Sequence, residues 1–332
     1  MTWGLDDALE EPREAPVRRR RWVTAVLALF VLALLGLCVL RLGGFDLNRY
    51  TTAAIALTPY LAAAGLLLAF LSLVLRRRLL TFTALVLSIA FGFLLIPRYL
   101  ADGEPLPTGQ RVRVMTANLL MGKADAPTVI RLARDAKADV LVLQELTPQA
   151  LNALDAAGLP GLLPHRVAQP AGGTSGSAIL AKVPLRQIVL VQGSFHDQPA
   201  AVVDLSGNTD VEIVSVHAYP PVLNEEGRRR WQADLEALPS SDSKGRPRIL
   251  AGDFNATLDH EALHGVMDRG YWDSAEVVGE GMRPTWSHFP YGPPVTIDHV
   301  LVDRRLGVAE VKVYDLPGSD HNAVVAEVAL PR

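Results

Sequence analysis

The chain has 332 residues with a formal net charge of −3, and 49% of its residues are apolar. Its mean hydropathy of +0.21 is high for a soluble enzyme, and the apolar excess lies almost entirely before residue 97. This uneven distribution argues against a single soluble domain. Over residues 101–332, 29 Asp and Glu outnumber 21 Lys and Arg, which argues against a basic nucleic-acid-binding surface.

Three uncharged apolar runs occupy the first region, at residues 22–40, 53–75 and 79–96. At about 1.5 Å per residue, each is long enough to cross a hydrocarbon core of roughly 30 Å. The alternatives are a buried helical hairpin in a soluble core and a cleaved signal peptide. Three such runs in succession, with no small-residue cleavage site before the second, argue against both. We therefore predict three transmembrane helices within residues 22–98.

Basic clusters flank these runs and predict their orientation. Arg18–Arg21 precedes the first run, and Arg76–Arg78 joins the second run to the third. Because clusters of Arg stay in the cytoplasm, residues 1–21 are expected to be cytoplasmic. Three crossings then place everything after Ile96 outside. The prediction is a multi-pass protein of the cell membrane with an extracytoplasmic globular domain.

The region after the third run reads as a linker, residues 99–110, followed by a globular domain, residues 111–332. The linker is rich in Pro, Gly and polar residues. In the domain, helices are predicted over 126–136 and 225–238. Strand cores are predicted at 111–115, 139–143, 179–180, 201–205, 212–216, 248–250, 300–302, 311–313 and 324–328. Several neighbouring strands are too close for crossover helices, so we expect a mixed α/β domain with many antiparallel pairs.

Polar side chains able to bind a metal or a phosphate stand at the ends of these strands. In chain order they are Asn118, Gln144 with Glu145, His217, Asp253 with Asn255, Asp298 with His299, and Asp320 with His321. A single Asp or Asn after a strand is usually a turn former, and one histidine alone could be a satisfied core residue. A buried, unpaired carboxylate is costly, which makes Glu145 harder to explain in this way. Because six strand ends carry such residues, we predict that these side chains lie together along one edge of the sheets, which we call the rim.

The residue types of this rim indicate a site for a cation and a phosphate. Carboxylate oxygens without thiols favour a hard cation, so we expect Mg²⁺, with Mn²⁺ as an alternative, rather than zinc. Hydrolysis of a phosphate ester needs a cation on a non-bridging oxygen, a carboxylate that orients water, and donors that neutralise the developing charge. The rim offers residues suited to each task.

Six motifs in order carry a resemblance to a known family. They are TANLL at 116–120, LVLQEL at 141–146, VSVHAYPP at 214–221, LAGDFNAT at 250–257, TIDHVLV at 296–302 and GSDHNAV at 318–324. This series resembles the endonuclease/exonuclease/phosphatase (DNase I-like) superfamily over residues 112–329. The preceding spans resemble its membrane-anchored bacterial branch. The resemblance implies a four-layer α/β sandwich, two packed mixed β-sheets flanked by helices, with a divalent-metal site at one edge.

The resemblance also implies a metal site. Glu145 would be the main ligand, Asn118 would help to frame the site, and Asp320 would lie beside the metal. Ser175 and Ser177 match a loop that often faces the site in this family.

The catalytic roles that the resemblance implies fall on five further residues. Asp253 would orient or deprotonate the attacking water, and Asn255 would contact the scissile phosphate. His217 would donate to the phosphate or to the leaving group. Asp298 would orient His321, which would bind the phosphate.

The sequence leaves the substrate open among three readings. A membrane anchor favours a phosphoester or pyrophosphate on a membrane lipid or lipid carrier, because a short linker holds the active site near the headgroups. An extracytoplasmic endonuclease or exonuclease is the alternative, and the acidic charge counts against it. A non-catalytic membrane module that binds a partner is the second alternative, and the intact motifs count against that. No protein partner and no organic cofactor are inferred.

Several other polar residues match no motif. Arg228–Arg230 lies on the helix predicted after His217, where a solvated face is favoured over a basic recognition loop. No role is predicted for the remaining histidines, which are His165, His196, His260, His264 and His288.

Overall fold

The computed structural model describes residues 15–103, 105–205, 210–287 and 292–332, with side chains from Arg21 onward. It divides into two units. One holds the apolar helices up to Val39 and over Pro59–Gly92, and the other joins Leu40–Thr58 to Phe93–Arg332. The segment between the first two apolar runs therefore folds with the C-terminal region. His288 lies outside the described residues, as does most of the predicted cytoplasmic segment.

The apolar helices are α1 (Ala15–Leu42), α3 (Thr58–Val74) and α4 (Arg78–Leu95). Two stretches, Arg21–Leu42 and Arg78–Tyr99, are long and apolar enough to cross a membrane. There are three candidate spans if α3 is counted together with the short helix α2 (Arg49–Ile55), from which it is bent by 77°.

The predicted second span, residues 53–75, is thus divided between two helices. Pro59 is the second residue of α3. Proline fits the first turn of a helix but cannot continue one, because it lacks an N–H and disfavours helical geometry in the residue before it. Leu57, between the two helices, donates its backbone N–H to Ala54 O at 3.1 Å, which closes the turn that ends α2.

Helices α3 and α4 pack directly against each other. Ser88 of α4 donates a hydrogen bond to the Ala62 carbonyl of α3 at 2.6 Å. Gly65 faces Ser88 so closely that a side chain there would have to displace it. Small residues and interhelical hydrogen bonds are typical of helix contacts within membranes. Outward-facing side chains such as Leu29, Phe70 and Phe82 are more than half exposed, as expected of helices that face lipid.

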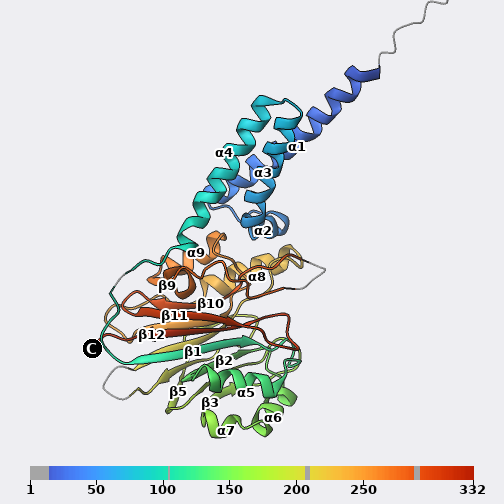
Figure 1. The fold of residues 1–332 in the computed structure, drawn as a ribbon. Coiled ribbons are helices and arrows are strands. Elements are labelled where there is room, and N and C mark those ends of the chain that lie inside the picture. Colours follow the sequence, from blue (N-terminus) through green and yellow to red (C-terminus); the bar gives the residue numbers. More distant parts are fainter. Residues whose placement is uncertain (1–14, 104, 206–209, 288–291) are drawn as a thin grey trace, which may run out of the picture. The chain divides into compact units, whose positions relative to one another are not determined.

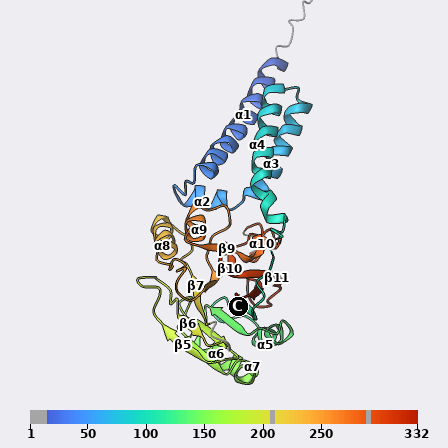
Figure 2. The same ribbon diagram turned by 90° about the vertical axis from the view of Figure 1, so that its left-hand side faces the viewer.

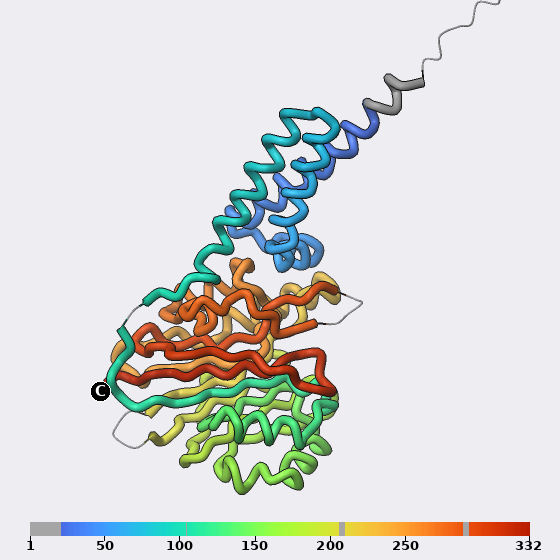
Figure 3. The backbone as a smooth tube through the Cα atoms, viewed as in Figure 1, coloured from blue at the N-terminus to red at the C-terminus, as the bar shows by residue number. Residues whose placement is uncertain are grey.

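Within the described residues, twelve strands form two six-stranded sheets (Figure 1 and Figure 3). The first has the order β11 (Gly307–Tyr314), β12 (Ala323–Ala329), β1 (Arg111–Asn118), β2 (Val140–Gln144), β4 (Ser177–Ala181), β3 (His165–Gln169). The second has the order β5 (Leu185–Ile188), β6 (Ala200–Val203), β7 (Val211–His217), β8 (Arg248–Asp253), β10 (Asp298–Asp303), β9 (Tyr271–Asp273). Only the pairs β1–β2 and β7–β8 are parallel among these neighbours.

The two sheets pack face to face, and helices cover their outer faces (Figure 1 and Figure 2). Valine, isoleucine and alanine side chains from both sheets fill the space between them. One outer face carries α5 (Ala126–Asp135), α6 (Pro148–Ala156) and α7 (Leu159–Leu162). The other carries α8 (Glu225–Glu236) and α9 (Glu261–Met267), while α10 (Ser274–Val277) follows β9 and the 3-10 helix η1 (Ile96–Tyr99) follows α4. The predicted four-layer sandwich is confirmed.

A buried ionic cluster joins both membrane-proximal segments to the C-terminal region. Arg98 makes a bidentate hydrogen bond to Asp259 at 2.7 and 2.8 Å, and Arg41 Nε donates to the same carboxylate at 3.1 Å. Burial alone would raise the pKa of Asp259, but hydrogen bonds and charge from Arg98 and Arg41 hold it below its ordinary value. The end of the first apolar helix and the segment directly after α4 therefore meet at one carboxylate.

Replacing Asp259 by asparagine is expected to lower the free energy of unfolding by about 3 kcal/mol, because two buried guanidinium groups lose their counter-charge. Thermal unfolding of the full-length protein in detergent would measure this. Asp268→Asn is the matched control, since Asp268 is exposed at the end of α9. An Asp259→Asn protein that melts with the wild type would contradict this role.

Candidate active site

The strand ends that carry the predicted site residues meet at one edge of the sandwich. Asn118 ends β1, His217 and Asp253 end the parallel strands β7 and β8, and Glu145 follows β2. Asp298 begins β10, which is antiparallel to β8 and pairs it directly with Asp253. An antiparallel strand starts where its neighbour ends, so its first residues reach the same edge. By the same rule, the turn before β12 brings Asp320 and His321 to the end of β1.

An amide and two carboxylates form the centre of the site. Asn118 Nδ2 donates to Glu145 Oε1 at 3.2 Å and to Asp253 Oδ2 at 3.1 Å, so one side chain bridges the two sheets. The Met121 N–H donates to the other oxygen of Glu145 at 2.6 Å. Burial raises the pKa of Glu145, against the lowering effect of these two hydrogen bonds. Glu145 has a φ of +55°, a strained backbone conformation of the kind that gathers at functional sites.

Asp253 is almost fully buried and is fixed on both oxygens. The Asn255 backbone N–H donates to Oδ1 at 2.8 Å, and the Asn255 side chain donates to Oδ2 at 3.2 Å and to the Ala218 carbonyl at 3.0 Å. Burial, with the nearby Asp298 charge, raises the pKa of Asp253 to about 7, against the lowering charge of His321. Gly252, directly before it, approaches the Val216 carbonyl so closely that no side chain would fit. A carboxylate with this pKa can accept a proton near neutral pH.

His321 and Asp298 form a buried ion pair. His321 Nδ1 lies 2.9 Å from Asp298 Oδ2, and Nε2 lies 3.8 Å from Asp253 Oδ2. Burial alone would lower the pKa of His321, but the charges of Asp298 and Asp253 raise it to about 10. The Thr285 hydroxyl accepts the backbone N–H of Asp298 at 2.9 Å, which fixes the acid. His321 is therefore a cation at neutral pH with one N–H held by Asp298 and the other directed at the site.

His217 differs from His321 because it is neutral. Its Nε2 lies 3.9 Å from Glu145 Oε1 and 4.0 Å from Asp253 Oδ2. Burial, with the nearby His196 and His321, holds the pKa of His217 well below its ordinary value. The ring of His196 stacks on that of His217 at 4.0 Å between centroids, and His196 Nε2 contacts Thr174 Oγ1 at 3.1 Å. Burial lowers the pKa of His196 as well, so two neutral rings can stack without repulsion.

The turn before β12 places Asp320 beside this group. Ser319 Oγ donates to the Asn118 carbonyl at 2.8 Å and accepts the His321 N–H at 3.1 Å. Trp286 Nε1 donates to Asp320 Oδ2 at 3.0 Å, and the charge of Asp320 contributes to the raised pKa of Glu145. The eight residues predicted from the sequence thus converge.

A cavity of about 730 Å³ opens over these residues. Glu145, His217, Asp253, Asn255 and His321 line it. Among the described residues that line the cavity, none is Lys or Arg. A phosphate entering it would meet several carboxylates with His321 as the cationic side chain, so the site needs further positive charge. The oxygen-rich donor set therefore fits a divalent cation.

Three ligand atoms of Asp253, Asp298 and His321 lie within 4.8 Å of one another, which is close enough for metal coordination by distance alone. A protonated imidazole has no free lone pair, however, and His321 already pairs with Asp298. The metal ligands predicted from the sequence, Glu145, Asn118 and Asp320, are a different set, and that assignment stays a prediction.

The cavity lining also shows what the sequence did not predict. His196, His260, Thr174 and Trp286 line the cavity. Among the described lining residues, the predicted loop contributes Thr174 rather than Ser175 or Ser177. These residues lie in segments that come together only in the folded protein. No local sequence pattern therefore predicts that they line the cavity.

The remaining unassigned residues have structural partners. Arg229 pairs with Glu226 on the exposed face of α8, as expected for a solvated helix. Arg228 instead donates to the Asp46 carbonyl at 3.0 Å. His264 Nε2 lies 2.9 Å from the Leu258 carbonyl, and His165 begins β3.

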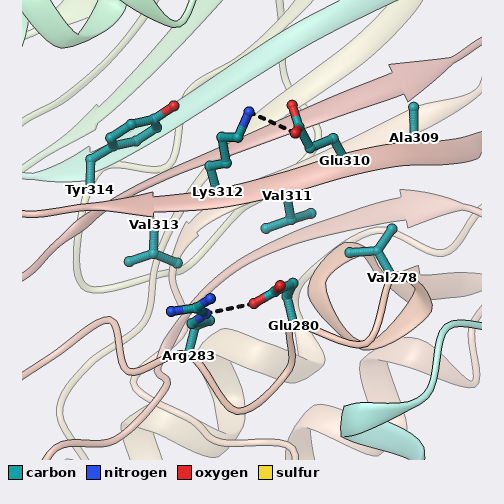
Figure 4. A pocket seen from close by; sticks show the side chains of 9 residues that line it. All are labelled: Val278, Glu280, Arg283, Ala309, Glu310, Val311, Lys312, Val313 and Tyr314. Atoms are coloured by element: carbon teal, nitrogen blue, oxygen red, sulfur yellow. Dashed lines mark hydrogen bonds and ion pairs between the residues drawn. The ribbon is translucent and has the colours of Figure 1, made fainter.

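A second cavity, of about 510 Å³, lies beside the edge strand β11 (Figure 4). Its charged side chains are paired with each other, Arg283 with Glu280 and Lys312 with Glu310, each at 2.6 Å. None of the predicted catalytic residues is among the described residues that line it. The predicted catalytic residues therefore lie at the first cavity and not at this one.

Comparison with solved structures identifies the fold. An AP endonuclease from Archaeoglobus fulgidus is similar with a TM-score of 0.53 and 15% identity, over 65% of this chain and 98% of that one. A 3′ phosphatase from Neisseria bound to a product DNA hairpin has a TM-score of 0.52 and 20% identity, over 65% and 98%. An endonuclease/exonuclease/phosphatase from Beutenbergia cavernae has a TM-score of 0.51 and 20% identity, over 67% and 72%.

No curated protein gives a sequence match to this chain. The sequence model of the endonuclease/exonuclease/phosphatase family, however, matches residues 115–321, a range that covers well over half of the chain and holds all eight predicted site residues. Members of this family are hydrolases that act on phosphoester bonds and generally use divalent metals. With its fold and its converging acids and histidines, this chain belongs to the endonuclease/exonuclease/phosphatase family and is a phosphoester hydrolase.

Proposed function

We propose that this protein is a membrane-anchored, metal-dependent phosphoesterase that hydrolyses a phosphate ester or pyrophosphate of a membrane lipid or lipid carrier on the outer face of the membrane. The choice of a lipid substrate rests on one observation. The segment between the first two apolar runs is part of the catalytic unit, and Arg41 and Arg98 both bind Asp259. An active site held in this way stays at the membrane boundary, where phosphorylated headgroups lie.

The same observation supports the orientation. Leu40–Thr58 and Phe93–Arg332 share one unit, so in this proposal they lie on the same side of the membrane. The chain between them, α3 and α4, then crosses and returns, and Arg76–Arg78 lies at its far end. Arg18–Arg21, before the first apolar run, lies on that far side as well. Because basic clusters stay in the cytoplasm, the catalytic unit faces outward.

A reporter fusion tests this orientation. An alkaline phosphatase fused after residue 105 or after residue 47 is expected to be active, because that enzyme folds outside the cytoplasm. The same reporter fused after residue 77 is the matched control and is expected to be inactive. Activity only after residue 77 would reverse the orientation and exclude an outer-face substrate.

The geometry supports a direct role for each acid and base. Asp253 would take a proton from a water as its oxygen attacks phosphorus, because its raised pKa suits a base near neutral pH. His321, kept cationic by Asp298, would hold a non-bridging phosphate oxygen. Asn255 would contact the phosphate from beside Asp253. His217 would donate its N–H to the phosphate or the leaving oxygen.

Glu145 would be the main ligand of a Mg²⁺ or Mn²⁺ ion, with Asn118 and Asp320 beside it. A bound divalent cation supplies positive charge to the phosphate and stabilises the charge that develops during hydrolysis. The hydrogen bonds from Asn118 and the Met121 N–H fix the Glu145 carboxylate before any cation binds.

A nuclease is the alternative function, since one of the similar structures is an AP endonuclease and another is a 3′ phosphatase bound to a product DNA hairpin. Nucleic acid presents several phosphates in a row, and its binding depends on Lys and Arg contacts to them. The described lining of the cavity has neither residue, and the region after residue 100 is acidic overall. A lipid with a single phosphorylated head group fits this lining better.

One assay separates the two functions. Full-length protein in detergent is given dipalmitoyl phosphatidic acid, a polyprenyl diphosphate, a phosphodiester lipid or linear duplex DNA, with Mg²⁺, Mn²⁺ or EDTA. We expect phosphate release from a lipid with Mg²⁺ or Mn²⁺ and none with EDTA. Asp253→Asn protein serves as the blank for contaminating phosphatases. Degradation of DNA without any lipid turnover would reject the lipid substrate and leave the spans as an anchor.

A further inference from the structure

The active-site cavity is larger than a phosphate requires. Its volume of about 730 Å³ falls in the range of sites that hold a whole small molecule, whereas a phosphate group contributes only five heavy atoms. The catalytic residues occupy one part of the lining. The part beyond them is largely apolar, so the cavity is built for a ligand with a phosphate at one end and an apolar body at the other.

Three segments form the apolar part of the lining. Ala53, Ala56 and Leu57 come from α2 and the turn that follows it. Val222 and Leu223 come from the loop after β7, and Val295 and Ile297 from the segment before β10. Val222 and Leu223 are each more than half exposed, so the apolar lining continues to the protein surface.

The segment that supplies α2 also carries exposed apolar residues outside the cavity lining. Phe45, Leu47 and Tyr50 of the segment Leu40–Thr58 are at least half exposed. They lie between the first two apolar runs, where the chain leaves the membrane. Exposed aromatic and aliphatic side chains at such a position are typical of contact with the interfacial region of a bilayer.

Helix α2 is a fixed wall rather than a loose connection. Asn48 caps its start with a capping box that includes Thr51. The Arg49 N–H donates to Glu225 at 2.8 Å, and the Arg49 guanidinium donates to the Leu223 carbonyl at 2.7 Å. These contacts join α2 to the loop that carries Leu223 and to the start of α8.

The end of α2 that borders the cavity is also fixed. The Thr52 carbonyl lies 3.0 Å from His260 Nε2, and the Ala262 N–H donates to Asp46 at 3.1 Å. His260, which also lines the cavity, accepts the Thr257 N–H at 2.9 Å, so it ties α2 to the segment that follows β8. The position of Ala53 and Ala56 relative to Asp253 is therefore set by the fold.

We propose that the apolar lining of this cavity, with Ala53, Ala56 and Leu57 of the α2 segment as one wall, is a binding subsite for the hydrocarbon chain of a phosphorylated lipid. The inference rests on the proposed function, since it places the lipid's chain beyond the phosphate that the enzyme hydrolyses. The chain enters from the bilayer side along Val222 and Leu223 and leads the phosphate toward His321. A nucleoside would also stack on aromatic lining residues, but none of the described residues that line the cavity is a Lys or Arg that could bind its neighbouring phosphates.

A chain-length series with a matched pair of variants tests the subsite. Ala53→Trp fills the apolar cavity, whereas Ala54→Trp makes the same change at the neighbouring α2 residue, which is not among the described lining residues. kcat/KM is measured in detergent with Mg²⁺ for dihexanoyl and dipalmitoyl phosphatidic acid. We expect Ala53→Trp to reduce kcat/KM for the long-chain substrate at least tenfold more than for the short-chain one. Ala54→Trp is expected to leave the ratio between the two substrates as in the wild type.

The chain-length series separates a failure of the proposed function from a failure of the proposed subsite. Wild-type protein that turns over neither lipid would reject the proposed function. Wild-type protein that turns over both, with an Ala53→Trp variant that loses both equally or neither, would reject the subsite alone.

A second measurement does not depend on turnover. Full-length Asp253→Asn protein in nanodiscs is irradiated with a phosphatidic acid that carries a diazirine near the end of one acyl chain, and the labelled peptides are identified by mass spectrometry. Labelling of the peptide that holds Ala53–Leu57 is expected, and an excess of dioleoyl phosphatidic acid should suppress it while dioleoyl phosphatidylcholine should not. Equal suppression by both lipids would show bilayer contact only and overturn the subsite.

Discussion

Replacing Asp253 by asparagine is expected to lower phosphoester turnover by about a thousandfold, because an amide cannot accept the proton of the attacking water. The change preserves the shape of the side chain, and the amide oxygen keeps the donors of one side, whereas the NH2 group faces a donor of Asn118 or Asn255 on the other. The measurement is kcat/KM of the full-length protein with Mg²⁺, on whichever lipid or DNA substrate the wild-type protein hydrolyses.

The folded protein should not suffer from this substitution. Burial raises the pKa of Asp253 to about 7, which means that the fold disfavours its charged form. A neutral asparagine removes that unfavourable charge, so the melting temperature is expected to stay the same or rise. Asp268→Asn, at an exposed position, is the control and should change neither property. Near-normal turnover in Asp253→Asn would remove this carboxylate from the mechanism.

The convergence of the site could be predicted from the sequence because it follows from local rules. A polar residue directly after an apolar strand lies at the edge of a sheet, whatever the strand's neighbours are. Asn118, His217 and Asp253 obey this rule at the ends of β1, β7 and β8. Which strands pair, and that Asp298 lies opposite Asp253, depends on contacts between distant parts of the chain, which the structure shows and no local sequence pattern predicts.

The short strands were harder to predict. β5 and β9 have four and three residues and lie at the edges of their sheet. An edge strand is held on one side only, and its outward residues need not be apolar, so β5 shows no apolar alternation. Its identity as a strand comes from its pairing with β6.

The membrane-proximal segment could not be predicted from hydropathy. The apolar run 53–75 reads as one span, yet its first residues form the end of α2 and the lining of the cavity. Pro59 and the Asn48–Thr51 capping pattern were the local signals that a helix ends and another begins there. Arg41 and Arg98 reach Asp259 from 218 and 161 positions away, and no sequence pattern predicts such a contact.

His196 shows the same limit at the active site. It follows no strand and belongs to no motif, so the sequence offered no reason to place it near His217. Only the fold stacks the two rings. A single histidine outside any motif produces no spacing or periodicity in the sequence from which its contact with His217 could be predicted.

Replacing His321 by glutamine is expected to lower kcat by about a hundredfold to a thousandfold, because the phosphate loses a charged hydrogen-bond donor. Asp298→Asn should produce a loss of similar size, since the Asp298 charge both keeps His321 protonated and orients its ring. Because the two residues act as a unit, the double variant should be little worse than the more damaging single one. The measurement is kcat and KM for the two single variants and the double variant.

Non-additivity distinguishes this unit from two independent structural residues. If Asp298 supported only the fold, its loss would multiply with that of His321, and the double variant would be far less active than either single one. His165→Gln is the matched control, because His165 begins an edge strand and is not among the described residues that line the cavity. Multiplicative losses, or normal turnover in His321→Gln, would contradict the pair as the phosphate-binding unit. A strongly reduced kcat without a further loss in the double variant would instead mean that the acid acts through the imidazole, as the 2.9 Å contact between them indicates.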